Sequence, residues 1–193
     1  MEEVILNALR IREGQHVSGE ELSRLCGVSR TAIWKEIQKL REQGYKILAQ
    51  PHVGYQLMGI PDRMVPQELT WGLGIQRIGR KVHSYETTDS TMDVAHRLAA
   101  GGEPEGSVVV AEGQGQGRGR LGRTWASPKG KGIYLSVILR PPLQLSQAAH
   151  VTLASAVSVA QAIQKATDLK PQIKWPNDVL LEGKKVAGIL TEL

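Results

Sequence analysis

The sequence lacks phenylalanine altogether, and aromatic residues make up only 4% of its 193 residues. Because 41% of the residues are hydrophobic, the core must be built mainly from aliphatic side chains. A single cysteine, Cys26, excludes an internal disulfide and is typical of a reducing compartment. No apolar run reaches the ~18 residues of a membrane span, and the acidic, amphipathic start MEEVILNALRIREG is not typical of a signal peptide. We therefore expect a soluble, cytoplasmic protein without membrane contact.

Motifs of the commonest nucleotide-binding and metal-binding classes are also absent. No G-x-x-x-x-G-K-[ST] string precedes a helix, and no G-x-G-x-x-G string lies in a strand–turn–helix context. The histidines show no metal-ligand spacing, so the sequence predicts no metal site; they are His16, His52, His83, His96 and His150.

Residues 113–132, GQGQGRGRLGRTWASPKGKG, form a glycine-rich cationic segment. They include seven glycines, five arginines or lysines and no acidic residue, a charge equal to the +5 of the whole chain. Glycine lets backbone N–H groups approach a ligand, and arginine forks grip carboxylate or phosphate at two points. Ordering each residue costs about 1 kcal/mol or more, so we expect residues 115–123 to be mobile until an anion binds. An RNA-binding stretch is the alternative, but Trp125 is the only aromatic residue there for base stacking.

Residues 1–60 predict three helices followed by a hairpin. Ser18, with Glu21 three residues later, forms a capping box that starts the second helix, and Ser29 can cap the third. The two strands of the hairpin flank residues 51–54. The predicted inward-facing residues are Val4, Ile5, Ala8 and Leu9 in the first helix, and Ile33, Ile37 and Leu40 in the third.

This order of elements is that of a winged helix-turn-helix module, which places its third helix in the DNA major groove. The predicted DNA-binding residues are Ser29, Arg30, Thr31, Trp34 and Lys35. A small helical domain that only mediates contacts is the alternative. The module is nearly neutral, although on the third helix up to residue 41 only Glu36 opposes the four cations Arg30, Lys35, Lys39 and Arg41. Weak charge favours two copies, and hence a homodimer on two-fold operator DNA.

Pro61 and Pro66 indicate a linker over residues 61–66, which separates the module from a second domain at 67–193. Strand candidates alternate there with few helices, which predicts an α+β fold. The strands are expected within 81–86, 107–112, 133–141 and 172–176, a long apolar helix at 148–167, and a hairpin that turns at 182–184.

Two strings, GQGRGRLGRTWASPKGKGIYLSVILRP and KWPNDVLLEGKKVAGILTEL, strongly resemble biotin–protein ligases. Together with the amino-terminal module, nearly the whole chain resembles a bifunctional biotin ligase and biotin-operon repressor. The resemblance implies a mixed-sheet, class II synthetase-like catalytic domain that makes biotinyl-5′-adenylate from biotin and MgATP. It further implies transfer of biotin to a lysine of a biotin carboxyl carrier protein, so biotin, ATP and Mg2+ are the expected ligands. Family members continue beyond the position of Leu193, so we expect a catalytic domain that is truncated at its carboxyl end.

The same resemblance implies roles for individual residues. Arg118 and Lys185 are the expected catalytic pair, which faces the reacting carboxylate and α-phosphate. The alternative for Ser90 is a simple helix cap, and for Lys185 a solvated hairpin lysine. Met92 stands where the family usually has Asn, so one polar contact of the family is not expected at this position. The implied biotin-binding residues are Ser90, Thr91, Gln114, Arg118, Gly119, Arg120 and Lys185, and the implied ATP and adenylate residues are Arg120, Arg123, Trp125, Asn177 and Asp178.

Two further functions compete with this one. A biotin-responsive repressor without enzymatic activity also accounts for the helix-turn-helix, and biotin-dependent pyrophosphate release distinguishes it from a ligase. Lipoate ligases share the expected fold and reaction type, but their arginine–glycine and lysine motifs differ from the strings found here.

Overall fold

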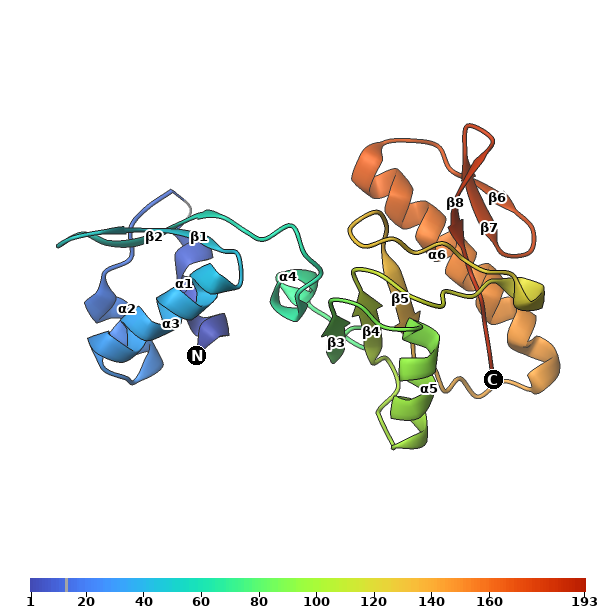
Figure 1. Ribbon diagram of the computed structural model, residues 1–193, viewed down its shortest axis with the longest axis horizontal. Coiled ribbons are helices and arrows are strands. Elements are labelled where there is room, and N and C mark those ends of the chain that lie inside the picture. The colour runs from blue at the N-terminus through green and yellow to red at the C-terminus, as the bar shows by residue number, and fades with distance from the viewer. Residues whose placement is uncertain (13) are drawn as a thin grey trace. The chain divides into compact units, whose positions relative to one another are not determined.

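The computed structural model describes residues 1–12 and 14–193, which form two compact units, Met1–Gly74 and Ile75–Leu193 (Figure 1). The first unit has the predicted order of three helices and a hairpin, followed by a short helix that the sequence did not predict. Its elements are α1 (Glu2–Ile11), α2 (Gly19–Cys26), α3 (Arg30–Glu42), β1 (Lys46–Gln50), β2 (Gly54–Gly59) and α4 (Pro66–Thr70).

The core of the first unit is aliphatic, as the composition requires. Ile33, Ile37 and Leu40 of α3 are fully buried, which confirms the predicted inner face of that helix. The prediction for α1 is wrong in one respect, because Val4 is 42% exposed whereas Leu6 is buried. The inner face of α1 therefore runs through Ile5, Leu6 and Leu9.

Side-chain caps fix the turn between α2 and α3. The Ser18 hydroxyl oxygen accepts the Glu21 backbone N–H at 3.0 Å, and the Ser29 oxygen accepts the Ala32 N–H at 3.2 Å. Gly27 ends α2 in the left-handed conformation, with φ +66°. Both predicted caps are confirmed.

The short helix α4 belongs to the first unit. Glu68 forms an ion pair with Arg10 of α1 and accepts a hydrogen bond of 2.6 Å from the Tyr45 hydroxyl. Burial, followed by the contact with Glu68, raises the pKa of Tyr45. The compact unit thus extends past the predicted linker at 61–66, while domain boundaries at 1–60 and 67–193 stay a prediction.

The second unit contains two three-stranded sheets rather than one continuous sheet. In the first, β3 (Val82–Tyr85) is parallel to β4 (Val108–Ala111), which is antiparallel to β5 (Tyr134–Val137). Helix α5 (Thr91–Ala100) packs on this sheet through Val94 and Ala95, against Val109 and Ile138. The predicted α+β class with a mixed sheet is confirmed.

The second sheet is antiparallel, in the order β6 (Gln172–Lys174), β7 (Asp178–Leu181) and β8 (Lys184–Gly188). The long helix α6 (Ala148–Thr167) packs on β6 and β7 (Figure 1). Two 3-10 turns, Arg120–Gly122 and Leu145–Gln147, complete the elements. Within the described part of the chain, no helix has the length and apolarity that a membrane crossing requires.

The hairpin of the first unit depends on a glycine. Val17 and Tyr55 exchange backbone hydrogen bonds of 2.8 and 2.9 Å, which bring Gly54 against the Val17 carbonyl. Gly54 has φ +138°, and a Cβ atom there would overlap the Val17 carbonyl oxygen and lie 2.9 Å from Ser18 Cα. Both the conformation and the space exclude a side chain.

We predict that Gly54→Ala destabilises the first unit by more than about 3 kcal/mol, since backbone strain and overlap act together. Gly27→Ala is the matched control, because Gly27 also has positive φ but no atom within 4 Å of a Cβ. It should cost only about 1 kcal/mol. Amide hydrogen exchange over residues 1–74 of the full chain measures both. Equal losses would contradict the steric explanation.

Candidate functional site

A cleft of about 870 Å3 lies within the second unit. Its walls come from the start of α5, the glycine-rich loop, β5 and the β7–β8 hairpin. Every residue predicted to contact biotin or the adenylate lines it: Ser90, Thr91, Gln114, Arg118, Gly119, Arg120, Arg123, Trp125, Asn177, Asp178 and Lys185. Segments almost a hundred residues apart in sequence therefore share one space.

At one end of the cleft, polar groups surround the start of α5. Ser90 is the N-cap, as the alternative interpretation proposed, and its oxygen accepts the Met92 N–H at 3.2 Å. The Thr91 N–H and hydroxyl both donate to Gln114 Oε1, at 2.9 and 3.1 Å. The Thr91 oxygen in turn lies 2.9 Å from the Ser136 hydroxyl.

Gln114 is held from both ends of its amide. Its Nε2 donates to Ser127 Oγ at 2.9 Å, and the Ser127 hydroxyl donates to the Trp125 carbonyl at 3.0 Å. Ser127 and Ser136 are buried, and sequence reasoning missed both. This network fixes the orientation of the Gln114 amide, so the cleft offers a preformed set of polar groups.

The glycine-rich loop follows a defined path with its own backbone hydrogen bonds. Gly119 N–H donates to the Arg123 carbonyl at 2.7 Å, and Trp125 N–H to the Gly117 carbonyl at 2.8 Å. A Cβ atom on Gly117 would overlap the Trp125 carbonyl, so glycine is needed for this close approach. Mobility of residues 115–123 before ligand binding stays a prediction.

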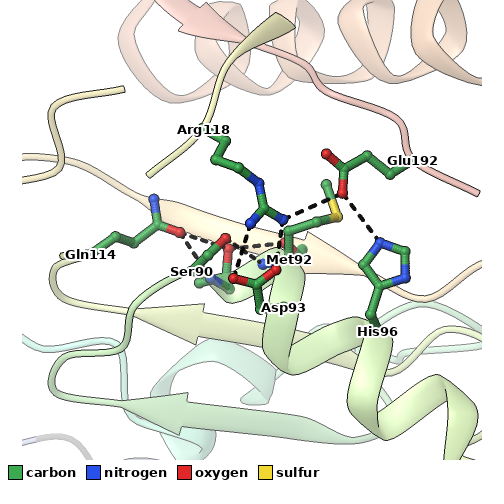
Figure 2. Close-up of polar contacts among 9 residues, drawn as sticks. Ser90, Met92, Asp93, His96, Gln114, Arg118 and Glu192 are labelled. Atoms are coloured by element: carbon green, nitrogen blue, oxygen red, sulfur yellow. Dashed lines mark hydrogen bonds and ion pairs between the residues drawn. The ribbon is translucent and has the colours of Figure 1, made fainter. Parts of the chain in front are cut away.

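Arg118 is paired with carboxylates that sequence reasoning missed (Figure 2). Its two terminal nitrogens donate to the two carboxylate oxygens of Asp93, at 3.0 and 2.6 Å. The second nitrogen also lies 3.5 Å from Glu192, which contacts His96 at 3.3 Å. The hydrogen bonds from Arg118 lower the pKa of Asp93, and the same contact raises the pKa of Arg118. Arg118, one of the five cations of the glycine-rich segment, is thus paired with carboxylates of neighbouring segments.

Lys185 lies in the part of the cleft wall that the β7–β8 hairpin forms. Its Nζ lies 2.7 Å from Asp178 Oδ1 and 4.8 Å from the centre of the Trp125 ring. A neighbouring contact holds Arg120, which donates to Asn177 Oδ1 at 3.1 Å. Lys184 does not line the cleft, as expected for alternate residues of a strand.

The predicted DNA-binding residues gather on one surface of the first unit. Ser29, Arg30, Thr31, Trp34 and Lys35 are all exposed at the start of α3, and Trp34 is 53% exposed.

Two of the four cations predicted on α3 are engaged within the unit, however. Lys39 pairs with Glu2 at 2.5 Å, which lowers the pKa of that carboxyl, and Arg41 donates to the Ile47 carbonyl at 3.0 and 2.6 Å. Of the four cations on the helix, Arg30 and Lys35 remain available to a partner.

Models of known protein families match parts of both units. A family model described as Biotin/lipoate A/B protein ligase family matches residues 84–193, more than half of the chain. The chain belongs to this family. A model for an HTH domain matches residues 2–56, which covers α1, α2, α3, β1 and the start of β2.

Relatives of this ligase family match across both units. The chain is 42% identical over 179 residues to the Bifunctional ligase/repressor BirA of Bacillus subtilis, which covers 93% of this chain and 55% of that protein. It is 37% identical over 184 residues to the protein of the same name from Escherichia coli, covering 95% and 56%. The chain therefore spans about half the length of the curated relatives it matches.

Solved structures of the ligase family resemble the second unit in fold. The biotin protein ligase of Leishmania major in complex with biotinyl-5-AMP matches with a TM-score of 0.52 and 31% identity, over 57% of this chain and 51% of that one. The Aquifex aeolicus enzyme in complex with biotin and ATP matches with a TM-score of 0.52 and 37% identity, over 59% and 47%.

The position of the Lys185 ammonium depends on Gly188. A Cβ atom on Gly188 would lie 3.1 Å from both Lys185 Cε and Trp125 Cζ3. We predict that Gly188→Ala moves the ammonium or the ring by a few tenths of an ångström without unfolding the unit. The chemical shift of the Trp125 indole N–H measures this displacement, and the thermal midpoint measures stability.

Gly101→Ala is the control, because a Cβ there meets only ordinary contacts of 3.4 and 3.5 Å. An unchanged Trp125 signal in Gly188→Ala would show that the glycine does not fix the lysine.

Proposed function

We propose that the second unit activates biotin with ATP to biotinyl-5′-adenylate and transfers biotin to a lysine of a biotin carboxyl carrier protein. One observation carries this proposal: a single cleft combines the Thr91–Gln114 polar network with Arg118, Arg120 and Lys185. Such a site suits a ligand with a polar ring at one end and an anion at the other. The solved relatives that hold biotinyl-5-AMP, or biotin and ATP, support the same ligands.

The reaction requires that the enzyme position the two substrates and neutralise their negative charge, and it requires no protein base. The carboxylate of biotin is already a nucleophile; its oxygen attacks the α-phosphorus of ATP, and pyrophosphate leaves. Cations that face the carboxylate and the α-phosphate stabilise the negative charge of the transition state. Arg118 and Lys185 are the side chains we assign to this task, and Ser90, Thr91 and Gln114 orient the ring system of biotin.

Asp178 and Trp125 position Lys185 for this role. The carboxylate contacts the ammonium, and the ring restricts where the ammonium lies. Asn177, held by its contact with Arg120, orders the loop near the nucleotide.

Magnesium enters with ATP as part of the substrate. The described residues include no cluster of three or more His, Cys, Asp or Glu side chains that could hold a metal on its own. Mg2+ is commonly bound by one or two carboxylates together with substrate phosphates, and Asp178 in the cleft wall suits that mode.

In the second step, the lysine amine of the carrier protein attacks the acyl carbon of the mixed anhydride and expels AMP. This step needs no enzyme nucleophile, since the adenylate already carries the leaving group.

We further propose that the first unit represses biotin-synthesis genes as a homodimer on operator DNA, in a cytoplasmic setting. The exposed face of α3 supports DNA binding, and its two available cations favour two modules per site. The adenylate would set repression if the loop that it contacts also shapes the dimer surface.

Lys185→Gln tests the catalytic proposal. We predict that it lowers biotin-dependent pyrophosphate release by at least about a hundredfold, since a preorganised charge is lost from the transition state. Lys184→Gln should change the rate by less than about twofold, because that side chain lies outside the cleft. Comparable losses in both variants would contradict the assigned strand face. Biotin binding without pyrophosphate release in the parent chain would favour the non-enzymatic repressor.

Lys35→Gln tests the DNA-binding face. We predict weaker binding to DNA from upstream of biotin-synthesis genes, with a salt dependence reduced by about one phosphate contact. Lys39→Gln is the control of equal charge, because Lys39 is paired with Glu2. Gel shifts at several salt concentrations measure both variants. A larger effect of Lys39→Gln would show that the wrong face was assigned.

A further inference from the structure

Arg118 is already paired with carboxylates of the chain itself. Its fork is filled by a bidentate contact to Asp93, and Glu192 approaches the same nitrogen (Figure 2). The two carboxylates come from different segments, the first turn of α5 and the strand-free segment after β8. One guanidinium therefore contacts two carboxylates, and Glu192 also contacts His96.

The direction of the fork matters for ligand binding. Arg118 lines the cleft, whereas neither Asp93 nor Glu192 does. The terminal nitrogens thus point at groups outside the space that a ligand would occupy. A guanidinium that holds a carboxylate with both terminal nitrogens has its end-on fork occupied, and only Nε–H and the outer N–H bonds remain for a second anion.

We propose that Asp93 and Glu192 act as an internal anion that competes with a ligand carboxylate or phosphate for the end-on fork of Arg118. This inference rests on the proposed function, since it takes Arg118 to be the group that grips the ligand anion. Asp93 and Glu192 are positioning residues, which hold the Arg118 guanidinium and give it up to the ligand anion on binding.

The strength of the contact suits an exchange. The Arg118 and Asp93 side chains are 39% and 45% exposed, and ion pairs that open to solvent contribute little. A ligand that reaches both the polar network and Arg118 can therefore replace Asp93. A neutral ligand lacks the negative charge that would replace the Asp93 carboxylate at Arg118. The internal anion thereby lowers the affinity for anionic ligands alone.

Asp93→Asn tests this exchange by calorimetry with two probes, biotin and its neutral carboxamide. The variant should bind biotin about two- to fivefold more tightly, the range expected for one exposed ion pair. Binding of the carboxamide should stay within about twofold of the parent. Glu192→Gln should change biotin affinity in the same direction by a smaller factor, because its contact is longer.

Glu86→Gln is the matched control. Glu86 forms an exposed ion pair with Lys129 in the same unit, and neither residue lines the cleft. It should leave the biotin-to-carboxamide affinity ratio unchanged. Weaker or unaltered biotin binding by Asp93→Asn would overturn the internal-anion proposal.

A readout without ligand separates this proposal from the proposed function. Trypsin should cleave after Arg118, Arg120 or Arg123 at least about twofold faster in Asp93→Asn than in the parent chain or in Glu86→Gln. Equal cleavage rates would overturn the proposal even if biotin binds. If the parent bound neither biotin nor its carboxamide, the proposed function would fail, and the cleavage rates would still decide whether Asp93 holds Arg118.

Discussion

The bidentate ion pair between Arg118 and Asp93 ties the glycine-rich loop to the first turn of α5. The loop is rich in glycine and cations, and the pair adds a side-chain contact to backbone hydrogen bonds such as that from Gly115 N–H to the Thr88 carbonyl at 2.9 Å. With the pair in place, Gln114 at the loop's start reaches Thr91, and Arg120 further along reaches Asn177. The loop therefore connects the start of α5 to Asn177, and the Arg118–Asp93 pair is one of the contacts that place it.

Lys185, in the part of the cleft wall formed by the β7–β8 hairpin, is likewise paired with a carboxylate. Lys185 is held by Asp178 and by the face of Trp125, in space that Gly188 leaves open. Each of these two cations has a protein carboxylate beside it before any ligand arrives. Charged groups that are fixed in advance need little reorganisation when a ligand anion replaces or joins their partners. A cleft arranged in this way is suited to chemistry on carboxylates and phosphates.

Much of this arrangement could be predicted from the sequence, because local rules decide it. Ser18 and Ser29 cap their helices, and alternation along β8 separates Lys185 from Lys184. The partners of two cleft side chains could not be predicted, because only the tertiary fold brings them together. Asp93 and Glu192 contact Arg118, and Ser127 contacts the Gln114 amide. For the same reason the contacts of Lys39 with Glu2, and of Arg41 with the Ile47 carbonyl of β1, could not be predicted from the third helix alone. The inner face of α1 differs from the prediction because Leu6, and not Val4, packs in the core of the first unit.

The central claim is that the cleft recognises an anion through Arg118 and Lys185. Calorimetric titration of a non-hydrolysable biotinyl-adenylate analogue at rising salt concentration tests it most directly, with biotin carboxamide as the neutral reference. We predict that affinity for the adenylate falls steadily as salt screens the charges, whereas affinity for the carboxamide stays constant. The same salt dependence for both ligands would contradict the claim.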